Sequence, residues 1–240
     1  RERAAREPDE RHLAVELAAD ERDRVEHVAQ LLHVGHRKAG HAGKRLTGSQ
    51  RRHGRLVTVF SPKGGTGKTV TATNLGSSLA KHWGKRALLL DLDLQFGDAA
   101  IMLGIEPEKT IYDLVTAPGE LDSEKLAGYT TRHASGLDVL PAPLRPEDAE
   151  LVTEAKLARL LEVARESYDV IVVDTSPFFH GPMLATLDRT DELLLICGLD
   201  VPTLKNVRLS LQTLELLSFP PDRIKLVLNR ANSKVGMKPK

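Results

Sequence analysis

Short runs of continuous apolar residues alternate with longer amphipathic stretches from residue 55 to the end of the chain. Strands with continuous rather than alternating hydrophobicity are typically covered on both faces, and strands that alternate with helices form parallel sheets. We therefore predict an α/β fold in which helices cover both faces of a mostly parallel β-sheet. The expected strands are 55–60, 86–93, 136–142, 169–177, 191–198 and 224–231, and the expected helices are 69–84, 110–117, 148–168 and 202–219.

The first 54 residues break this pattern. Residues 12–34 have apolar positions at helical spacing, and residues 27–55 hold seven Lys or Arg and no acid. We interpret residues 1–54 as an N-terminal helix followed by a basic, partly disordered linker, and residues 55–240 as the main domain. A nucleic-acid-binding arm is the less favoured interpretation of the same charges.

Composition narrows the class of protein. The chain has 240 residues, of which 41% are hydrophobic, enough for one good-sized core. Its net charge of +1 gives no overall field that would attract nucleic acid. The single cysteine, Cys197, excludes an internal disulfide and fits a reducing compartment. No apolar run approaches the roughly 18–20 residues of a membrane span, so we expect a cytoplasmic protein.

The most informative stretch is FSPKGGTGKTVT at residues 60–71, which lies between the first predicted strand and the first predicted helix. Three glycines, Gly64, Gly65 and Gly67, free the backbone so that successive N–H groups can face phosphate oxygens. The N-terminus of the following helix adds a positive potential at the same place. This pattern predicts a loop that binds the phosphates of a nucleotide.

Side chains of the loop are expected to complete this site. Lys68 would reach the β- and γ-phosphates, and the hydroxyl of Thr69 would ligate Mg²⁺. Thr66 is expected to add a backbone contact only. The loop departs from the general G-x-x-x-x-G-K-[ST] pattern, because Pro62 stands where the first glycine is expected and Lys63 provides a second lysine.

Polar side chains follow other predicted strands at the edge where ligands bind in open α/β sheets. Asp91 and Asp93 end the second strand, on the same side of an extended chain. Asp174 ends the fourth strand, and Asn229 lies in the sixth. An acid at such a position can hold Mg²⁺ through water or orient a water molecule for attack on the γ-phosphate.

These motifs together resemble the deviant-P-loop ATPases of the ParA/MinD superfamily, over residues 55–240. The motif K-G-G-x-G-K-T, with Lys63 ahead of the glycines, is specific to that superfamily. Within it, VFSPKGGTGKT, LLLDLDLQFGDAAIMLG and YDVIVVDTSP are most similar to the CpaE/TadZ branch, which places tight-adherence (Flp-type) pili or related secretion machinery at a cell pole. The resemblance implies the P-loop NTPase fold.

The resemblance also implies how ATP is bound. In this superfamily two subunits sandwich two ATP molecules as a homodimer, and the signature lysine, here Lys63, reaches the nucleotide of the partner. Asp93 is implied to orient the attacking water, and Asn229 is implied to contact the adenine. The implied catalytic residues are Lys63, Lys68 and Asp93, the metal residues are Thr69, Asp93 and Asp174, and the cofactor-binding residues are Lys63, Gly64, Gly65, Thr66, Gly67, Lys68, Thr69 and Asn229.

The chain departs from the family pattern in several places. Ser176 stands where many members have a second proline, and residues 1–54 are too short for the receiver-like domain that usually precedes the ATPase in this branch. The sequence stops at ANSKVGMKPK, where the family continues. We therefore expect the C-terminal part of the family domain, with part of the base-binding wall, to be missing. An amphipathic membrane helix like that of the division-site members would lie beyond Lys240.

These features favour an ATP-dependent dimerising ATPase, slow and stimulated by its partner or by dimer formation. Its expected role is to position Flp-type pilus or secretion machinery at a cell pole or at the inner membrane face. A ParA-like chromosome or plasmid partitioning ATPase is the first alternative, although the basic residues support DNA binding only weakly. A scaffold that binds ATP with little turnover is the second. An iron–sulfur reductase is rejected, because its clusters need several thiolates and Cys197 is the single cysteine.

Overall fold

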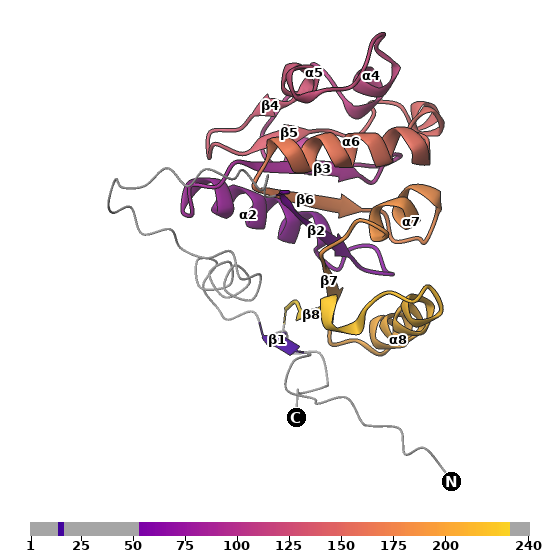
Figure 1. The fold of residues 1–240 in the computed structure, drawn as a ribbon. Helices are drawn as coiled ribbons and strands as arrows, with labels where there is room; N and C mark the ends of the chain where they lie inside the picture. Colours follow the sequence, from indigo (N-terminus) through magenta and orange to yellow (C-terminus); the bar gives the residue numbers. More distant parts are fainter. Residues whose placement is uncertain (1–13, 17–52, 231–240) are drawn as a thin grey trace, which may run out of the picture.

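The computed structural model describes residues 14–16, by their backbone, and residues 53–230. The strands of its central sheet are β1 (Ala14–Glu16), β2 (Arg55–Phe60), β3 (Ala87–Leu92), β4 (Thr131–Arg132), β5 (Asp138–Leu140), β6 (Val170–Thr175), β7 (Glu192–Cys197) and β8 (Ile224–Leu228). Their order in this eight-stranded sheet is β1-β8-β7-β2-β6-β3-β5-β4 (Figure 1). Neighbouring strands are parallel except for β4 and β5, which are antiparallel, so the mostly parallel sheet is confirmed.

Helices cover both faces of this sheet, as the sequence predicts. They are α2 (Lys68–Lys81), α3 (Ala99–Met102), α4 (Ile111–Thr116), α5 (Ser123–Tyr129), α6 (Glu154–Ser167), α7 (Gly181–Leu187) and α8 (Val201–Leu216), with the 3₁₀ helices η2 (Pro146–Leu151) and η3 (Pro221–Arg223). Val57 and Val59 of β2 pack against buried residues of α2. Leu56 and Phe60 of the same strand face the opposite side of the sheet. Leu56 packs with buried residues of α4–α6, and Phe60 packs with buried residues of α7 and α8.

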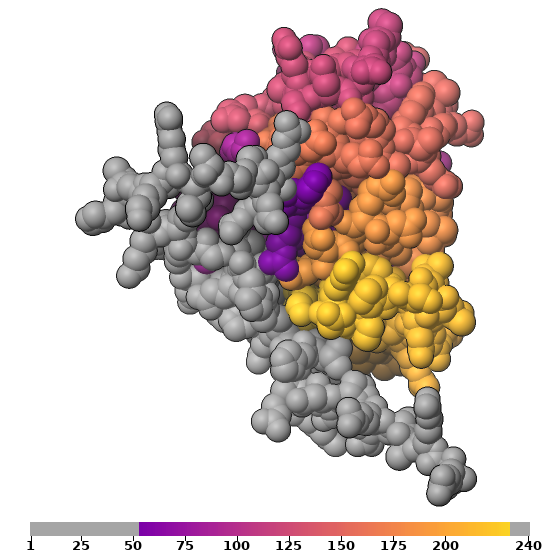
Figure 2. Space-filling view, in the orientation of Figure 1, coloured from indigo at the N-terminus to yellow at the C-terminus, as the bar shows by residue number. Residues whose placement is uncertain are grey.

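Figure 2 shows this arrangement on one face of the molecule, where the magenta α4–α5 region, the orange α6–α7 region and yellow α8 follow one another along the sheet. The order of strands reverses at β2, because the chain runs from β2 through α2 to β3 on one side and later adds β7 and β8 on the other. In open sheets of this kind a ligand crevice forms at the carboxyl ends of the strands that flank the reversal. The polar residues that follow β2, β3, β6 and β8 therefore meet at one edge of the sheet.

Short elements account for most differences from the predicted pattern. Residues 148–168 form η2 and α6 rather than one helix, because the Thr153 hydroxyl accepts a hydrogen bond from the backbone N–H of Lys156 and begins α6 anew. The pattern does not predict α3, α5 and α7, which have only four to seven residues and are too short to show a helical period. None of the described helices is long and apolar enough to cross a membrane.

The N-terminal region differs where it is described. Residues 14–16 form β1, which pairs in parallel with β8, whereas the sequence pattern predicts a helix over residues 12–34. The helix prediction is therefore wrong for these three residues, because pairing with a distant strand is not visible in local spacing. The rest of that helix and residues 35–52 of the basic linker lie outside the described residues, and the boundary near residue 54 stays a prediction.

Candidate functional site

The loop between β2 and α2 has a backbone conformation that glycine adopts most readily. Gly65 and Gly67 have φ angles of 73° and 94°, in the left-handed region. The Thr66 hydroxyl, between them, donates a hydrogen bond to the carbonyl oxygen of Lys63 at 3.2 Å. Gly67 is the N-cap residue of α2, so the loop runs directly into the positive end of that helix. The local geometry is that of a phosphate-binding loop.

Asn229 fixes this loop from the end of β8. Its side-chain amide donates a hydrogen bond to the carbonyl oxygen of Thr66 at 2.8 Å. A Cβ atom on Gly67 would lie only 2.4 Å from Asn229 Nδ2, so the close approach requires glycine. The structure thus gives Asn229 a role in holding the loop. The adenine contact that the family resemblance implies for Asn229 stays a prediction.

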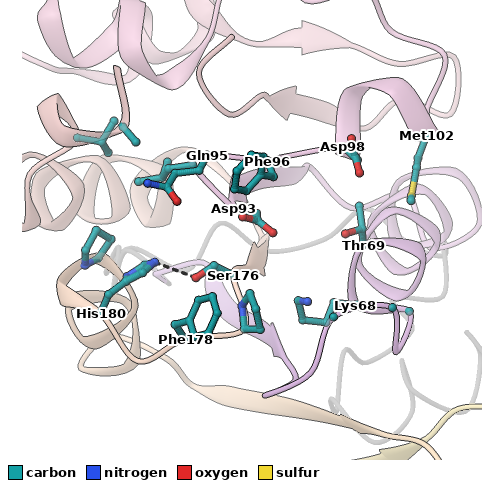
Figure 3. Close-up of a pocket in the computed structure, with 18 of the residues that line it drawn as sticks. Lys68, Thr69, Asp93, Gln95, Phe96, Asp98, Met102, Ser176, Phe178 and His180 are labelled. Carbon is teal, nitrogen blue, oxygen red and sulfur yellow. Dashed lines mark hydrogen bonds between the residues drawn. The ribbon is translucent and has the colours of Figure 1, made fainter. Parts of the chain in front are cut away.

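A cavity of about 1030 Å³ opens beside the loop. Lys68 and Thr69 line it from the start of α2, Asp93 lines it from beyond β3, and Ser176 lines it from beyond β6. Figure 3 shows these side chains around one opening. Ligand pockets typically enclose roughly 300–1,000 Å³, so the cavity has room for a nucleotide. Gly64, Gly65 and Gly67 also line it, whereas Lys63, Thr66, Asp174 and Asn229 do not.

Asp91 and Asp93 have separate roles. Asp91 is buried, and its two carboxylate oxygens accept hydrogen bonds from the backbone N–H groups of Asp93 at 3.1 Å and Ala99 at 3.0 Å. A Cβ on Gly97 would lie 2.5 Å from Asp91 Oδ2, so this loop is packed tightly around the carboxylate. Because β3 ends at Leu92, the alternation that would direct both acids to one side stops before Asp93. Asp91 holds the loop, and Asp93 faces the cavity.

Asp93 keeps partial contact with solvent at the cavity wall. Partial burial is the main cause that raises the pKa of its carboxyl above the ordinary value, and the charge of Asp98 adds to this effect. The positive charge of Lys68 acts in the opposite direction. A carboxylate with a raised pKa is a better proton acceptor, which suits a group that orients water.

Asp174 is deeply buried, with 1% of its surface exposed. It lies directly across from Asp91 in the β3–β6 pairing. Burial raises the pKa of Asp174 to about 6, while hydrogen bonding to the Thr69 side chain and the charge of Lys68 oppose the rise. One of its oxygens, Oδ2, is buried without a hydrogen-bond partner.

The unpartnered oxygen of Asp174 provides a test of whether these residues fit a magnesium ion. A buried polar oxygen without a partner is costly, and a hard cation nearby would remove that cost. Carboxylate and hydroxyl oxygens are the donors that Mg²⁺ prefers, and Asp174 and Thr69 bring one of each together. These residues therefore fit Mg²⁺ held mainly by nucleotide phosphates and water.

Lys63 has a partner within its own chain. Its ammonium group donates to Asp200 Oδ1 at 2.9 Å, and both side chains are 40% exposed. Asp200 is the N-cap residue of α8, where it also accepts hydrogen bonds from the backbone N–H and the hydroxyl of Thr203 at 3.0 and 2.6 Å. The Thr203 hydroxyl and Lys63 lower the pKa of Asp200 to about 2. Lys63 is thus directed toward α8 rather than into the cavity beside its own loop.

Sequence reasoning missed Asp200 and His180. Asp200 had a local signal, because an Asp two residues before a Pro in the first helical turn is a typical N-cap. Its pairing with Lys63 had none, because 137 positions separate the two residues. His180 caps α7, a position usually held by Ser, Thr, Asp or Asn, so the sequence pattern does not single it out.

The buried carboxyl pair predicts how stability depends on pH. Burial first, and the charge of Asp174 second, raise the pKa of Asp91 to about 8 from an ordinary value of 3.8. Because the folded state disfavours the charged form, the stabilising contribution of this carboxyl is complete below pH 3.8 and is lost as the pH rises through about 8. The nucleotide-free protein should therefore lose unfolding free energy across this range. Asp174→Asn removes both the neighbouring charge and the Asp174 carboxyl, whose own pKa is raised to about 6, so the variant should lose less.

Urea unfolding at about pH 5 and about pH 8 measures this difference. Asp188→Asn, which changes an exposed acid, is the matched control and should keep the wild-type pH dependence. Equal losses of unfolding free energy in wild-type protein and Asp174→Asn would contradict the raised pKa of Asp174 and its effect on Asp91.

The glycine loop between strand and helix, with Lys68 and Thr69 at the helix start, defines a P-loop nucleotide-binding protein. A protein-family model described as an AAA domain matches residues 54–219. The chain is 30% identical over 190 residues to the chromosome-partitioning ATPase Soj of Treponema pallidum. The match covers 77% of this chain and 70% of the relative. The chain therefore belongs to this AAA-domain family and, as its relatives show, to the ParA/MinD superfamily.

Solved structures agree with this assignment. The crystal structure of a ParA family ATPase from Chlorobium tepidum is 26% identical, with a TM-score of 0.71 over 75% of both chains. Cobyrinic acid a,c-diamide synthase from Mycobacterium smegmatis, with bound ATP analog and magnesium, is 25% identical, with a TM-score of 0.58 over 73% of this chain and 70% of that one. The chain spans between 51% and 66% of the length of several other curated relatives.

Proposed function

We propose that this chain is a dimerising ATPase switch that binds ATP with Mg²⁺ and hydrolyses it slowly, with stimulation by dimer formation or by a partner. The observation that carries the proposal is the cavity beside the glycine loop, which brings together the ammonium group of Lys68 and the carboxylate of Asp93. The Treponema and Chlorobium relatives are both named ATPases, which supports ATP as the nucleotide.

The residues of the cavity have distinct tasks in this proposal. Lys68 offsets the negative charge of the terminal phosphates, and Thr69 and Asp174 hold Mg²⁺. When bound, Mg²⁺ would supply further neutralisation of the phosphate charge. Asp93 accepts a hydrogen bond from a water molecule and orients it for in-line attack on the γ-phosphate.

Lys63 supports the proposal that the active form is a homodimer. It lies outside the cavity beside its own loop and is bound by Asp200 at an exposed position. A cation there can reach a nucleotide held by a second copy of the chain without serving its own. Charge from a neighbour arrives only when two ATP-loaded subunits meet, so nucleotide state and assembly become linked.

Asp93→Asn is expected to lower the kcat of ATP hydrolysis by about 100-fold or more, because general-base and water-orienting groups contribute on this scale. Affinity for ATP should change little, since the phosphates are held by the loop and by Lys68. Phosphate release under saturating ATP measures the effect. Asp98→Asn, an acid on the same loop, is the matched control and should keep most of the activity. Unchanged turnover in Asp93→Asn would instead favour an ATP-binding scaffold with little hydrolysis.

We further propose that this switch positions Flp-type pilus or secretion machinery, as the similarity of its motifs to the CpaE/TadZ branch suggests. Partitioning of a chromosome or plasmid is the alternative, which the name of the Treponema relative favours. DNA binding measured in about 50 mM and about 200 mM salt separates the two, because release of counterions makes true DNA binding steeply salt-dependent. Tight, salt-dependent binding in the ATP state would favour partitioning, and its absence together with capture of pilus-assembly proteins would favour positioning.

A further inference from the structure

Ser176 and His180 form a hydrogen-bonded pair at the wall of the nucleotide cavity. His180 Nε2 lies 2.8 Å from Ser176 Oγ. Both residues line the cavity that Lys68 and Asp93 also line, and Figure 3 shows the hydrogen bond beside Asp93. Ser176 is 7% exposed, so its hydroxyl is shielded from bulk water. Neither residue has a task in the proposed mechanism so far.

The hydrogen bonds of His180 determine the direction of this contact. Its other ring nitrogen, Nδ1, accepts a hydrogen bond from the backbone N–H of Met183 at 3.3 Å and thereby caps α7. A nitrogen that accepts carries no proton, so in the neutral ring the proton is on Nε2. Nε2–H therefore donates to Ser176 Oγ. The hydroxyl oxygen is then an acceptor toward His180, and its own O–H is left to donate to a group inside the cavity.

Electrostatics place the same ring close to the residue that orients water. His180 is among the groups that lower the pKa of Asp93, and both side chains line the same cavity. Ser176 also follows directly after β6, two residues beyond Asp174, which with Thr69 fits Mg²⁺. A donor at Ser176 is thus next to the place where the terminal phosphate must lie if Thr69 and Asp174 hold Mg²⁺.

We propose that Ser176 is a catalytic residue that donates a hydrogen bond to a γ-phosphate oxygen, and that His180 is the positioning residue that orients its hydroxyl. This inference rests on the proposed ATPase function. Negative charge on the γ-phosphate oxygens is redistributed as the bond to the leaving oxygen breaks, and a fixed neutral donor stabilises it without reorganisation. The loop binds the nucleotide, and the pair affects turnover only.

Two substitutions at position 180 separate this role from helix capping. His180→Asn keeps an acceptor near the place of Nδ1 and a good N-cap, but loses the donor near the place of Nε2. His180→Gln can keep the donor but loses the cap. We expect His180→Asn to lower kcat roughly 10- to 100-fold with KM for ATP unchanged, and to retain the wild-type melting temperature. His180→Gln should have a lower melting temperature but recover part of the kcat.

Ser176→Ala should lower kcat as much as His180→Asn, and the double variant should be no slower than either single variant, because both remove the same donor. ATP hydrolysis and the affinity for a non-hydrolysable ATP analogue are measured for all variants. If the wild-type protein hydrolyses ATP and both His180→Asn and Ser176→Ala keep full kcat, the proposed role of the pair is overturned and the proposed ATPase function stands. A wild-type protein that binds ATP without hydrolysing it would overturn the proposed ATPase and the pair together.

Discussion

Lys68→Ala is expected to lower the affinity of this chain for ATP by about 100-fold or more. Lys68 is only 8% exposed and lines the cavity, and its charge is close enough to Asp93 and Asp174 to lower the pKa of both. A charge-assisted hydrogen bond contributes about 1.5–3 kcal/mol, and Lys68 is expected to make such bonds to two phosphate groups. Loss of the cation also leaves the phosphates beside two carboxylates without compensation.

Titration with a non-hydrolysable ATP analogue, followed by calorimetry, measures this affinity. Lys81→Ala is the matched control, because Lys81 is an exposed lysine in the last turn of the same helix. It should bind the analogue as wild-type protein does. Circular dichroism shows whether each variant is folded. A folded Lys68→Ala protein with an affinity within about threefold of wild type would contradict the assignment of the phosphate site.

Lys63→Ala is expected to separate nucleotide binding from assembly. Because Lys63 lies outside the cavity of its own subunit, the variant should bind ATP with nearly wild-type affinity. It should lose ATP-dependent dimerisation, and turnover should fall with it, by about 100-fold or more if the cation completes the catalytic site. Sedimentation with a non-hydrolysable ATP analogue measures the dimer. A Lys63→Ala protein that dimerises as wild type does would exclude the cross-subunit role.

Asp200→Asn tests the proposed role of Lys63 by releasing this lysine instead of removing it. If Lys63 reaches a second subunit as proposed, it must first leave Asp200, and the ion pair would then oppose assembly. Asparagine is as good an N-cap as aspartate, and the variant should therefore keep α8 intact while it releases Lys63. We expect the Asp200→Asn protein to dimerise at lower protein concentration than wild type in the presence of the analogue. A weaker dimer would mean that Asp200 instead helps to place Lys63 for the partner.

The strands and the phosphate loop could be predicted from the sequence because their causes are local. A buried strand is visible as a continuous apolar run, as in residues 191–198, and the loop is visible because Gly65 and Gly67 need positive φ angles. The alternation of strand and helix predicted the class of fold but not the order of the strands in the sheet. The break between η2 and α6 at Thr153 depends on one capping hydrogen bond. The sequence pattern locates the ends of helices poorly, so it predicts one continuous helix there.

Some residues of the candidate site could be predicted from the sequence and others could not, for the same reason. Lys68 and Thr69 are placed by the loop itself, and their position beside Asp93 follows from the parallel sheet. The sequence did not distinguish Asp91 from Asp93, because the difference arises where β3 ends and the chain turns back to surround the Asp91 carboxylate. Asn229 was assigned to the adenine by resemblance, and its contact with the loop became visible only with β8 in place.

The sequence by itself determined that this chain has a P-loop, an α/β sheet and acids at the carboxyl ends of its strands, because periodicity and glycine spacing are properties of neighbouring residues. Only the tertiary structure decided which groups pair across the fold. Lys63 is bound by Asp200, and Ser176 is hydrogen-bonded to a histidine that also caps a helix. Such pairings depend on strand register and on loop paths that bring distant residues within about 3 Å, and no local pattern encodes them.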